Sequence, residues 1–526
     1  MRKTKYLWLL FLSGILAILI MLSGTVIAQQ EIPEIVDVTI RNVSNTAPSS
    51  VDPFLVTDRT GNVHLFWSED VGGRAAIGGT TAGNTLMYSR WDGVSWTSPI
   101  DIMITPADDP SLTEEPKAWQ PDAIVDDYGN IHLVWLGLHP EKLFYSTAPA
   151  DAANVASAWS TPEVLDENLT GTIYSVDIDY ESPDTLHLVY ARVNWEEQYA
   201  KGEPRTLTYL KSTDGGVTWS DPVDIAIAPD LERGFSNVRL LVVPEGKLYV
   251  SWTEWDQTGN GQIANVVRSL DSGATWDKPV RLAERQGNEY ERDWVKLASL
   301  GDDKLVATIE GGFRAYRQFL YSDDAGKTWE GPKDQFYWLI GENGFVEFAR
   351  DGADNLHLFV AQRIREGTIG RDGGLGLWHS VWLGGDQWSD TELVGGLNQM
   401  VNPRVVIAGG DTIIAAWYDF QVGEILVLNA TLNGVPKILP QPWLEKPETA
   451  VNPSTQPEES VPVETGDNSI NTEALPAVPS LDSIPLQPAA RPAGPGLLIM
   501  VGIISSAIFI FVVFLVMRLL KHRRHI

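Results

Sequence analysis

The chain has 526 residues and carries 69 Asp and Glu against 39 Lys and Arg, which gives a formal net charge of −30 at pH 7. This acidity, with no basic stripe in the body of the chain, argues against a nucleic-acid partner. The chain has no cysteine, which excludes disulfide bonds and thiolate metal sites. A folded body must therefore be stabilised by packing.

Residues 1–28 have the pattern of a signal peptide. Three basic residues (Arg2, Lys3 and Lys5) precede an apolar run from Tyr6 to Leu22, and the segment ends at a small residue, Ala28. The sequence therefore predicts export of the chain, with an uncleaved anchor as the alternative.

Residues 32–435 repeat a unit of four short apolar strands separated by turns. The second strand of the unit is the easiest to count, because it often ends in Trp. Its seven copies are NVHLFW (62–67), NIHLVW (130–135), TLHLVY (185–190), KLYVSW (247–252), KLVATI (304–309), NLHLFV (355–360) and TIIAAW (412–417).

The seventh unit has no fourth strand of its own, whereas the segment EIVDVTIRNV (34–43) precedes the first unit and alternates like a strand. Joining the two closes a ring and removes an open sheet edge. We therefore predict an all-β fold, a seven-bladed β-propeller of four-stranded antiparallel blades, with six blades as the alternative.

Three units share the pattern Ser-x-Asp-x-Gly-x-Thr-Trp, and SRWDGVSW (89–96) is a partial copy with Trp91 where Asp belongs. The pattern resembles the Asp box, or BNR repeat, of sialidases and related propellers. The resemblance implies a turn between the third and fourth strands of a blade, held by Asp, Gly and Trp. We expect a structural role for Ser212, Asp214, Gly216, Trp219, Ser269, Asp271, Gly273, Trp276, Ser322, Asp324, Gly326 and Trp329.

Four histidines occupy the same place in the second strand of four units: His64, His132, His187 and His357. Repetition at a structural position indicates scaffold residues rather than metal ligands. The acidic turns 58–62, 126–130 and 351–355 are better explained as hairpin turns than as calcium sites. We predict neither a metal ion nor a cofactor.

Propellers bind ligands where the loops after the second and fourth strands converge. We expect ligand binding by Arg239, Arg292 and Arg404, in or before first strands, and by Trp195 and Trp255, whose rings can stack on sugars. Ion pairs within the ring are the alternative for Arg239 and Arg404. The catalytic candidates follow second strands: Glu254, Glu310, Tyr418 and Asp419.

Residues 436–495 contain 13 of the 32 prolines and predict an extended stalk. Residues 496–517 carry no charge and are long enough, at ~1.5 Å per residue, to cross ~30 Å of hydrocarbon. The basic tail 518–526 then lies in the cytoplasm by the positive-inside rule. We therefore expect a single-pass type I protein in the cell membrane with the propeller outside.

The resemblance to sialidases implies an arginine triad on the substrate carboxylate, a Tyr nucleophile assisted by Glu, and an Asp acid/base. The family's first arginine lies in an early Phe/Tyr-Arg-Ile-Pro motif, and the corresponding segment APSSVDPFLV (47–56) contains no arginine. This difference favours a non-catalytic propeller that recognises a carbohydrate or a cell-surface glycoprotein. The alternative is an exo-glycosidase that removes terminal sialic acid or a related acidic sugar.

Overall fold

The computed structural model describes residues 32–45, 50–69, 85–104, 117–138, 142–166, 172–193, 206–228, 233–256, 260–312, 315–340, 345–364, 375–395, 400–419 and 422–446. The predicted signal peptide, the stalk beyond residue 446, the transmembrane segment and the basic tail lie outside these residues. Within the described ranges, no helix is both long and apolar enough to span a bilayer.

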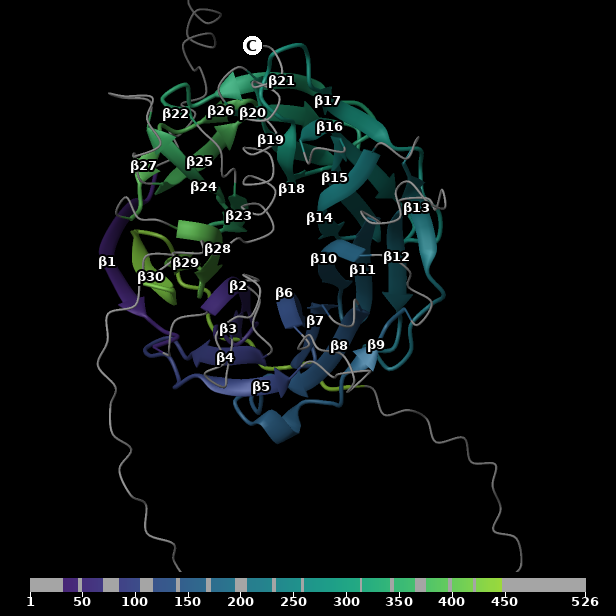
Figure 1. Ribbon diagram of the computed structural model, residues 1–526. Coiled ribbons are helices and arrows are strands. Elements are labelled where there is room, and N and C mark those ends of the chain that lie inside the picture. The colour runs from purple at the N-terminus through teal and green to yellow at the C-terminus, as the bar shows by residue number, and fades with distance from the viewer. Residues whose placement is uncertain are drawn as a thin grey trace, which may run out of the picture. The chain divides into compact units, whose positions relative to one another are not determined.

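The described strands form seven antiparallel blades arranged in a ring (Figure 1). The centre of the ring, between the first strands of the blades, is termed the channel. The seven-bladed prediction is therefore confirmed and the six-bladed alternative is wrong. Blades 1 to 3 contain β2(Ser50–Thr57), β3(Val63–Glu69), β4(Thr85–Trp91) and β5(Ile100–Ile104); β6(Lys117–Val125), β7(Asn130–Leu138), β8(Lys142–Pro149) and β9(Glu163–Val164), with the 3-10 turn η1(Ala156–Ala158); and β10(Thr172–Glu181), β11(Thr185–Val193), β12(Thr206–Ser212) and β13(Val223–Ile227).

Blades 4 to 7 follow in chain order, and blade 6 has its first and last strands in two pieces. The strands are β14(Arg233–Val243), β15(Lys247–Asp256), β16(Gly261–Ser269) and β17(Val280–Glu284); β18(Asp293–Gly301), β19(Lys304–Gly311), β20(Tyr316–Ser322) and β21(Glu330–Gln335); β22(Leu339–Ile340), β23(Val346–Arg350), β24(Leu356–Ile364), β25(Gly376–Gly384), β26(Gln387–Trp388) and β27(Glu392–Leu393); and β28(Met400–Ala408), β29(Thr412–Asp419), β30(Glu424–Asn433) and β1(Glu34–Asn42).

The ring is closed by the two ends of the propeller sequence. Strand β1 pairs antiparallel with β30, from Glu34 opposite Asn433 to Asn42 opposite Leu426. In Figure 1 the purple β1 accordingly lies beside the yellow-green β30. The N-terminal strand thus completes blade 7, as predicted, and its pairing covers the outer edge of β30.

Apolar side chains on both faces of the middle strands form the core between neighbouring blades. All seven residues of β3 are buried, which explains why second strands read as continuous apolar runs. Four of these strands contribute a Trp that is at most 1% exposed: Trp67, Trp135, Trp252 and Trp417. Replacing a buried Trp by Ala usually lowers the free energy of unfolding by ~3–5 kcal/mol, and we take this value as the contribution of each ring.

The three Asp boxes have the same internal geometry. In the first, Asp214 Oδ1 accepts the Thr218 backbone N–H at 2.9 Å and Asp214 Oδ2 accepts its hydroxyl at 2.6 Å, while Ser212 Oγ accepts the Gly216 N–H at 2.9 Å. Trp219 packs edge-on against Tyr145 of blade 2, at 5.4 Å between ring centroids. The box therefore shapes its own turn and contacts the preceding blade.

The strand register corrects the alignment of the partial box in blade 1. Trp91 lies opposite Val63 as Ser212 lies opposite Leu186, so Trp91 replaces the serine of the box and not its aspartate. The turn is shorter than the full box, and its carboxylate is Asp92, which accepts the backbone N–H groups of Val94 and Ser95 at 3.0 and 2.8 Å.

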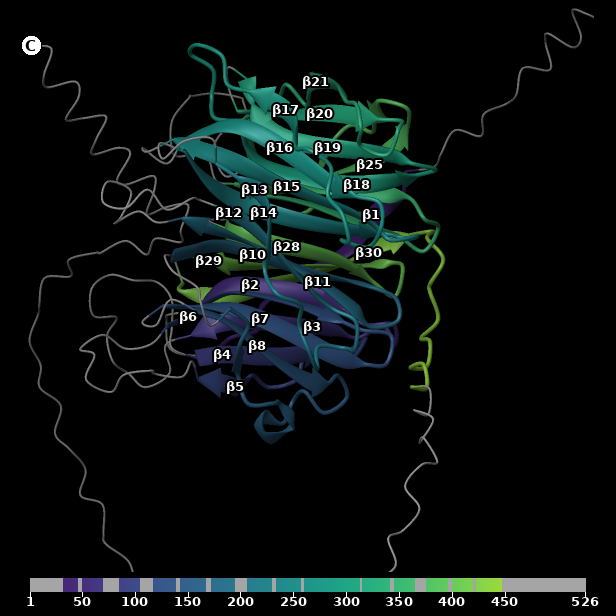
Figure 2. The ribbon, with the colours of Figure 1, turned by 90° about the vertical axis from the view of Figure 1, so that its right-hand side faces the viewer.

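The first residues of the predicted stalk lie against the propeller. Backbone N–H groups of Ile438, Gln441 and Leu444 donate to carbonyls in the first hairpin turns of blades 7, 1 and 2, at 2.8 to 2.9 Å. Gly129, at φ 84°, leaves room for the Trp443 ring, because a Cβ atom there would lie 2.6 Å from Trp443 Cδ2. This strap, residues 436–444, runs along one side of the blades in Figure 2.

Candidate functional site

The first strand of most blades bends near the channel at a β-bulge. Residue pairing shifts at this point in β2, β6, β10, β14, β18 and β28. Five of these bulges contain a residue in the left-handed region (Asp52, Gln120, Asn237, Trp294 and Asn402). Bulges re-aim the side chains that follow them and are frequent beside functional sites.

Eight ionisable residues of the first strands interact with one another through their charges, and this set is divided by sign. Blades 1 to 3 contribute acids (Asp52, Asp122, Asp177 and Asp179), blades 4, 5 and 7 contribute cations (Arg239, Lys296 and Arg404), and blade 6 contributes Glu347. These groups interact across the channel, since the Asp122 carboxyl experiences the charges of Asp177 and all three cations. They therefore form one shared electrostatic site.

Glu347 lies between two of the cations. Its Oε1 accepts a hydrogen bond from Arg404 Nη1 at 3.0 Å, and its Oε2 contacts the Lys296 ammonium. Burial pushes the pKa of Glu347 upward, but the charges of Lys296 and Arg404 outweigh burial and hold that pKa below its usual value. A carboxylate of the protein thus occupies this two-cation clamp.

Arg239 differs from the other two cations. Its Nη1 donates to the neighbouring Val238 carbonyl at 3.0 Å, and within the described residues it forms no ion pair at 4 Å or less. Burial and the repulsion of Arg404 lower its pKa, yet a guanidinium stays charged at neutral pH. Arg239 therefore has donors available for a ligand.

A small cavity of about 10 Å³, room for about one water molecule, lies beside Arg239. Its lining residues come from β14, β18 and the start of β23: Asn237, Arg239, Trp294, Val295, Lys296, Phe345, Val346 and Glu347. The rings of Trp294 and Phe345 contact each other, with centroids 4.4 Å apart. The cavity combines an aromatic wall with a cation, an amide and a carboxylate, and it is far smaller than the ~300–1,000 Å³ typical of ligand sites.

The acidic residues of blade 3 connect it to blade 4. Asp177 Oδ2 accepts the Leu240 N–H at 3.1 Å and Asp179 Oδ2 accepts the Val242 N–H at 2.9 Å. Burial raises the pKa of Asp179 to about 7, and burial with the charge of Asp177 raises the pKa of Asp122 well above the carboxyl range. This side of the channel therefore holds carboxyl groups that keep protons unusually well.

No protein-family model and no curated protein matches the chain. Similar solved structures include the Hadza microbial sialidase Hz136 (16% identity, 76% of this chain, 69% of that chain, TM-score 0.45). A second is a Penicillium chrysogenum α-L-arabinanase complexed with arabinobiose (14% identity, 60% of this chain, 94% of that chain, TM-score 0.40). A third is a Trypanosoma rangeli sialidase mutant that displays trans-sialidase activity (13% identity, 76% of this chain, 59% of that chain, TM-score 0.41). Seven antiparallel blades with Asp-box turns define the fold without these matches. It is a seven-bladed Asp-box propeller.

Of the predicted ligand-binding residues, the propeller brings Arg239 and Arg404 together in the channel. Arg292 is 4% exposed and donates to Glu289 at 2.6 Å, so it is paired away from the cavity lining. Trp255 is 5% exposed, which leaves no ring face for a sugar. Trp195 lies outside the described residues.

The predicted catalytic residues are dispersed. Glu254 Oε1 accepts a hydrogen bond from Asn265 at 2.9 Å, and Glu310 lies 3.7 Å from the buried Arg317. Tyr418 is 2% exposed in the apolar core between blades 7 and 1, where burial raises its pKa to about 12. Asp419, opposite Met400, is 7% exposed. None of the four lines the cavity.

The cavity also contains five residues that were not predicted from the sequence: Lys296, Glu347, Asn237, Trp294 and Phe345. The segments NVR (237–239), WVK (294–296) and NPR (402–404) place a cation two residues after the left-handed bulge residue. Aligning the first strands of all units on this position identifies Lys296 directly. The first strands therefore identify the cavity residues, whereas the predicted catalytic residues were chosen from positions after the second strands.

Proposed function

We propose that this propeller is a non-catalytic recognition module that binds a carbohydrate in the channel beside Arg239. The observation that carries the proposal is the position of Glu347, whose carboxylate is already bound by Lys296 and Arg404. A clamp that is filled by the protein's own carboxylate cannot also hold a substrate carboxylate. Arg239 is the remaining cation of the set.

The cavity lining supports a sugar ligand. An aromatic wall, here Trp294 with Phe345, suits the apolar face of a sugar ring, and Asn237 with Arg239 offers donors for hydroxyl groups. An acidic sugar gains a charge-assisted hydrogen bond from Arg239. We infer that a terminal residue of a glycan, free or on a cell-surface glycoprotein, is the ligand.

An exo-glycosidase of sialidase type is the second candidate, and one observation favours it. Asp179 and Asp122 keep protons unusually well, which is the property of a general acid. The burial of Tyr418 and the filled clamp oppose this candidate, because they leave the predicted nucleophile in the core and a single cation, Arg239, for a substrate carboxylate.

The predicted signal peptide and transmembrane segment, both outside the described residues, place the propeller outside the cell in this proposal. The strap contacts the turns between first and second strands, at the opposite end of the blades from the loops after the second strands. A tether that leaves from the strap leaves the cavity end accessible to partners. We therefore propose a membrane-tethered receptor for glycans.

The test uses the full-length chain in detergent on an array of acidic and neutral glycans, with a fluorogenic sialoside assay in parallel. We expect glycan binding that Arg239→Ala weakens about ten-fold or more, and no hydrolysis. Arg281→Ala is the matched control, because Arg281 is exposed on an outer strand and pairs with Glu284. Sialoside turnover that Asp179→Asn abolishes would show that the chain is an enzyme.

A further inference from the structure

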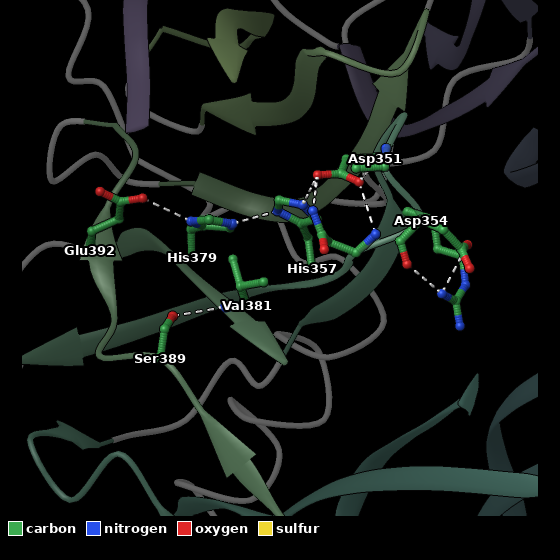
Figure 3. Close-up of polar contacts among 10 residues, drawn as sticks. Asp351, Asp354, His357, His379, Val381, Ser389 and Glu392 are labelled. Carbon is green, nitrogen blue, oxygen red and sulfur yellow. Dashed lines mark hydrogen bonds and ion pairs between the residues drawn. The ribbon is translucent and has the colours of Figure 1, made fainter. Parts of the chain in front are cut away.

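Blade 6 contains a buried chain of four ionisable side chains (Figure 3). Asp351 Oδ2 contacts His357 Nε2 at 3.1 Å, His357 Nδ1 contacts His379 Nε2 at 2.7 Å, and His379 Nδ1 contacts Glu392 Oε1 at 2.9 Å. The two imidazoles are 0% and 1% exposed and stack with their centroids 5.0 Å apart. Neither belongs to the channel cavity.

Blade 2 contains the equivalent arrangement with one difference. Asp126 contacts His132 Nε2 at 3.2 Å, and His132 Nδ1 contacts the Tyr145 hydroxyl at 2.7 Å. A neutral imidazole donates to the aspartate and accepts from the phenol, so every hydrogen bond has one proton. Blades 1 and 3 likewise have Tyr at this position, and only blade 6 of these four has histidine.

The three contacts of the Asp351–His357–His379–Glu392 series need one more proton than two neutral imidazoles supply. Three hydrogen bonds link two carboxylates through two imidazoles, so three N–H groups are required. Two neutral imidazoles carry one N–H each. With neutral imidazoles and ionised carboxylates, one of the three contacts therefore has no proton and places a nitrogen lone pair against another acceptor, which is costly in a buried site.

We propose that the Asp351–His357–His379–Glu392 chain is a proton-binding site, in which His379 holds the additional proton and so fastens the outer strand β27 of blade 6. Protonated His379 donates to both Glu392 and His357, and His357 then donates to Asp351. As pH rises, His379 releases its proton, the contact with Glu392 loses its hydrogen, and β27 loosens. The blade is thus tightened by acid.

The surroundings assign the proton to His379. Burial, and then the nearby His379, lower the pKa of His357 to about 4. Asp351 is acceptor-only, because it also accepts from Asn355 N and Nδ2 at 2.8 and 2.7 Å, and these bonds and His357 outweigh burial to lower its pKa. At the other end of the chain, the Glu392 side chain is 44% exposed and gives the proton a route to solvent.

The other charges near the chain are engaged elsewhere. On the same turn, Arg350 pairs with Asp354 at 3.0 Å. From blade 7, apolar side chains pack against Phe359 beside His357, and Asp411 of its first hairpin turn lies 3.4 Å from Lys437 of the strap. The proton on His379 is therefore balanced by Glu392.

Strand β27 is weakly held without this contact. It has two residues, which lie opposite Trp378 and His379 of β25, and the following Val394 N–H donates to the Leu377 carbonyl at 2.8 Å. A strand of this length depends on side-chain contacts for its stability. The protection of the Val394 amide hydrogen consequently reports on the proton of His379.

The decisive variant is Glu392→Gln. The glutamine amide donates to the Nδ1 atom of a neutral His379, so all contacts are satisfied without the additional proton. The chain also offers a matched control, Glu163→Gln, because Glu163 lies opposite Tyr145 in blade 2 as Glu392 lies opposite His379. Both glutamates are on short outer strands, so neither change disturbs the core.

The measurement follows exchange of the imidazole C2 hydrogens and of backbone amides in the full-length chain by mass spectrometry from pH 5 to 9. We expect Glu392→Gln to lower the proton affinity of His379 about ten-fold or more. In the wild type, protection of Val394 should fall as His379 loses its proton, and in Glu392→Gln protection should be independent of pH. Glu163→Gln should behave as the wild type.

Two results would overturn the proposal. One is an equal midpoint of His379 protonation in the wild type and Glu392→Gln, which would mean that the carboxylate does not stabilise the proton. The other is pH-independent protection of Val394 in the wild type. His379→Tyr copies the arrangement of blades 1 to 3, and pH-dependent protection of Val394 in this variant would also contradict the assignment.

Discussion

The polar groups of the Asp-box turns and those of the channel are satisfied in two different ways. In each turn, the aspartate bonds to a serine two residues before it and a threonine four residues after it, and the distances recur within 0.1 Å in all three boxes. In the channel, Glu347 of blade 6 is bound by Lys296 of blade 5 and Arg404 of blade 7. A turn whose polar groups bond to one another can recur in any blade. Channel residues that bond across blades, in contrast, make each of those blades depend on its neighbours.

The largest expected effect comes from the shared site. Glu347→Ala leaves two half-buried cations without their carboxylate, and we expect a loss of about 3–5 kcal/mol in the free energy of unfolding. Combination with Arg404→Met should recover part of this loss, with a coupling energy of about 0.5–3 kcal/mol. Urea denaturation of the four proteins of this cycle provides the measurement. Strict additivity would mean that the channel charges are independent.

The pH dependence of Asp179 gives a second expected effect in the channel. The folded-state pKa is raised to about 7, so the folded protein binds a proton that the unfolded chain releases near pH 4. Stability should therefore fall as pH rises from about 4 to 7, by at most about 1.4 kcal/mol per pH unit. Asp179→Asn should flatten this part of the profile of unfolding free energy against pH. An unchanged slope would contradict the raised pKa.

The smallest expected effect belongs to the turns. Ser212→Ala removes the acceptor of the Gly216 N–H and should cost about 1 kcal/mol. Ser322→Ala makes the same change in blade 5. Because the two boxes share no partner, the double variant should equal the sum within about 0.5 kcal/mol. A coupling above that value would show that the boxes are not independent units.

Repetition made the fold predictable from the sequence. Seven copies of one strand pattern and a spare strand at residues 34–43 were sufficient for the blade number and for the closure through β1. The alignment of Trp91 was wrong because letters were matched across turns of different length. Only the pairing of Trp91 with Val63 reveals that the turn of blade 1 is shorter.

The site was less predictable because it depends on differences between units. Glu254, Glu310 and Tyr418 stand at the ends of second strands, where side-chain direction alternates between the neighbouring cores and is not visible in the sequence. Arg239 and Arg404 were identified from their place in first strands. Glu347 was missed because its strand has no bulge residue in the left-handed region to mark the position.

The strap affects how the molecule carries mechanical load. A pull on the chain beyond Leu444 acts first on its hydrogen bond with Asp127 in blade 2, and then on those of Gln441 with Arg59 and of Ile438 with Gly409. The β30–β1 pairing, the last step in closing the ring, is reached only after these three contacts have opened. Tension on the chain beyond Leu444 is therefore distributed over three blades before it can open the ring at its closure.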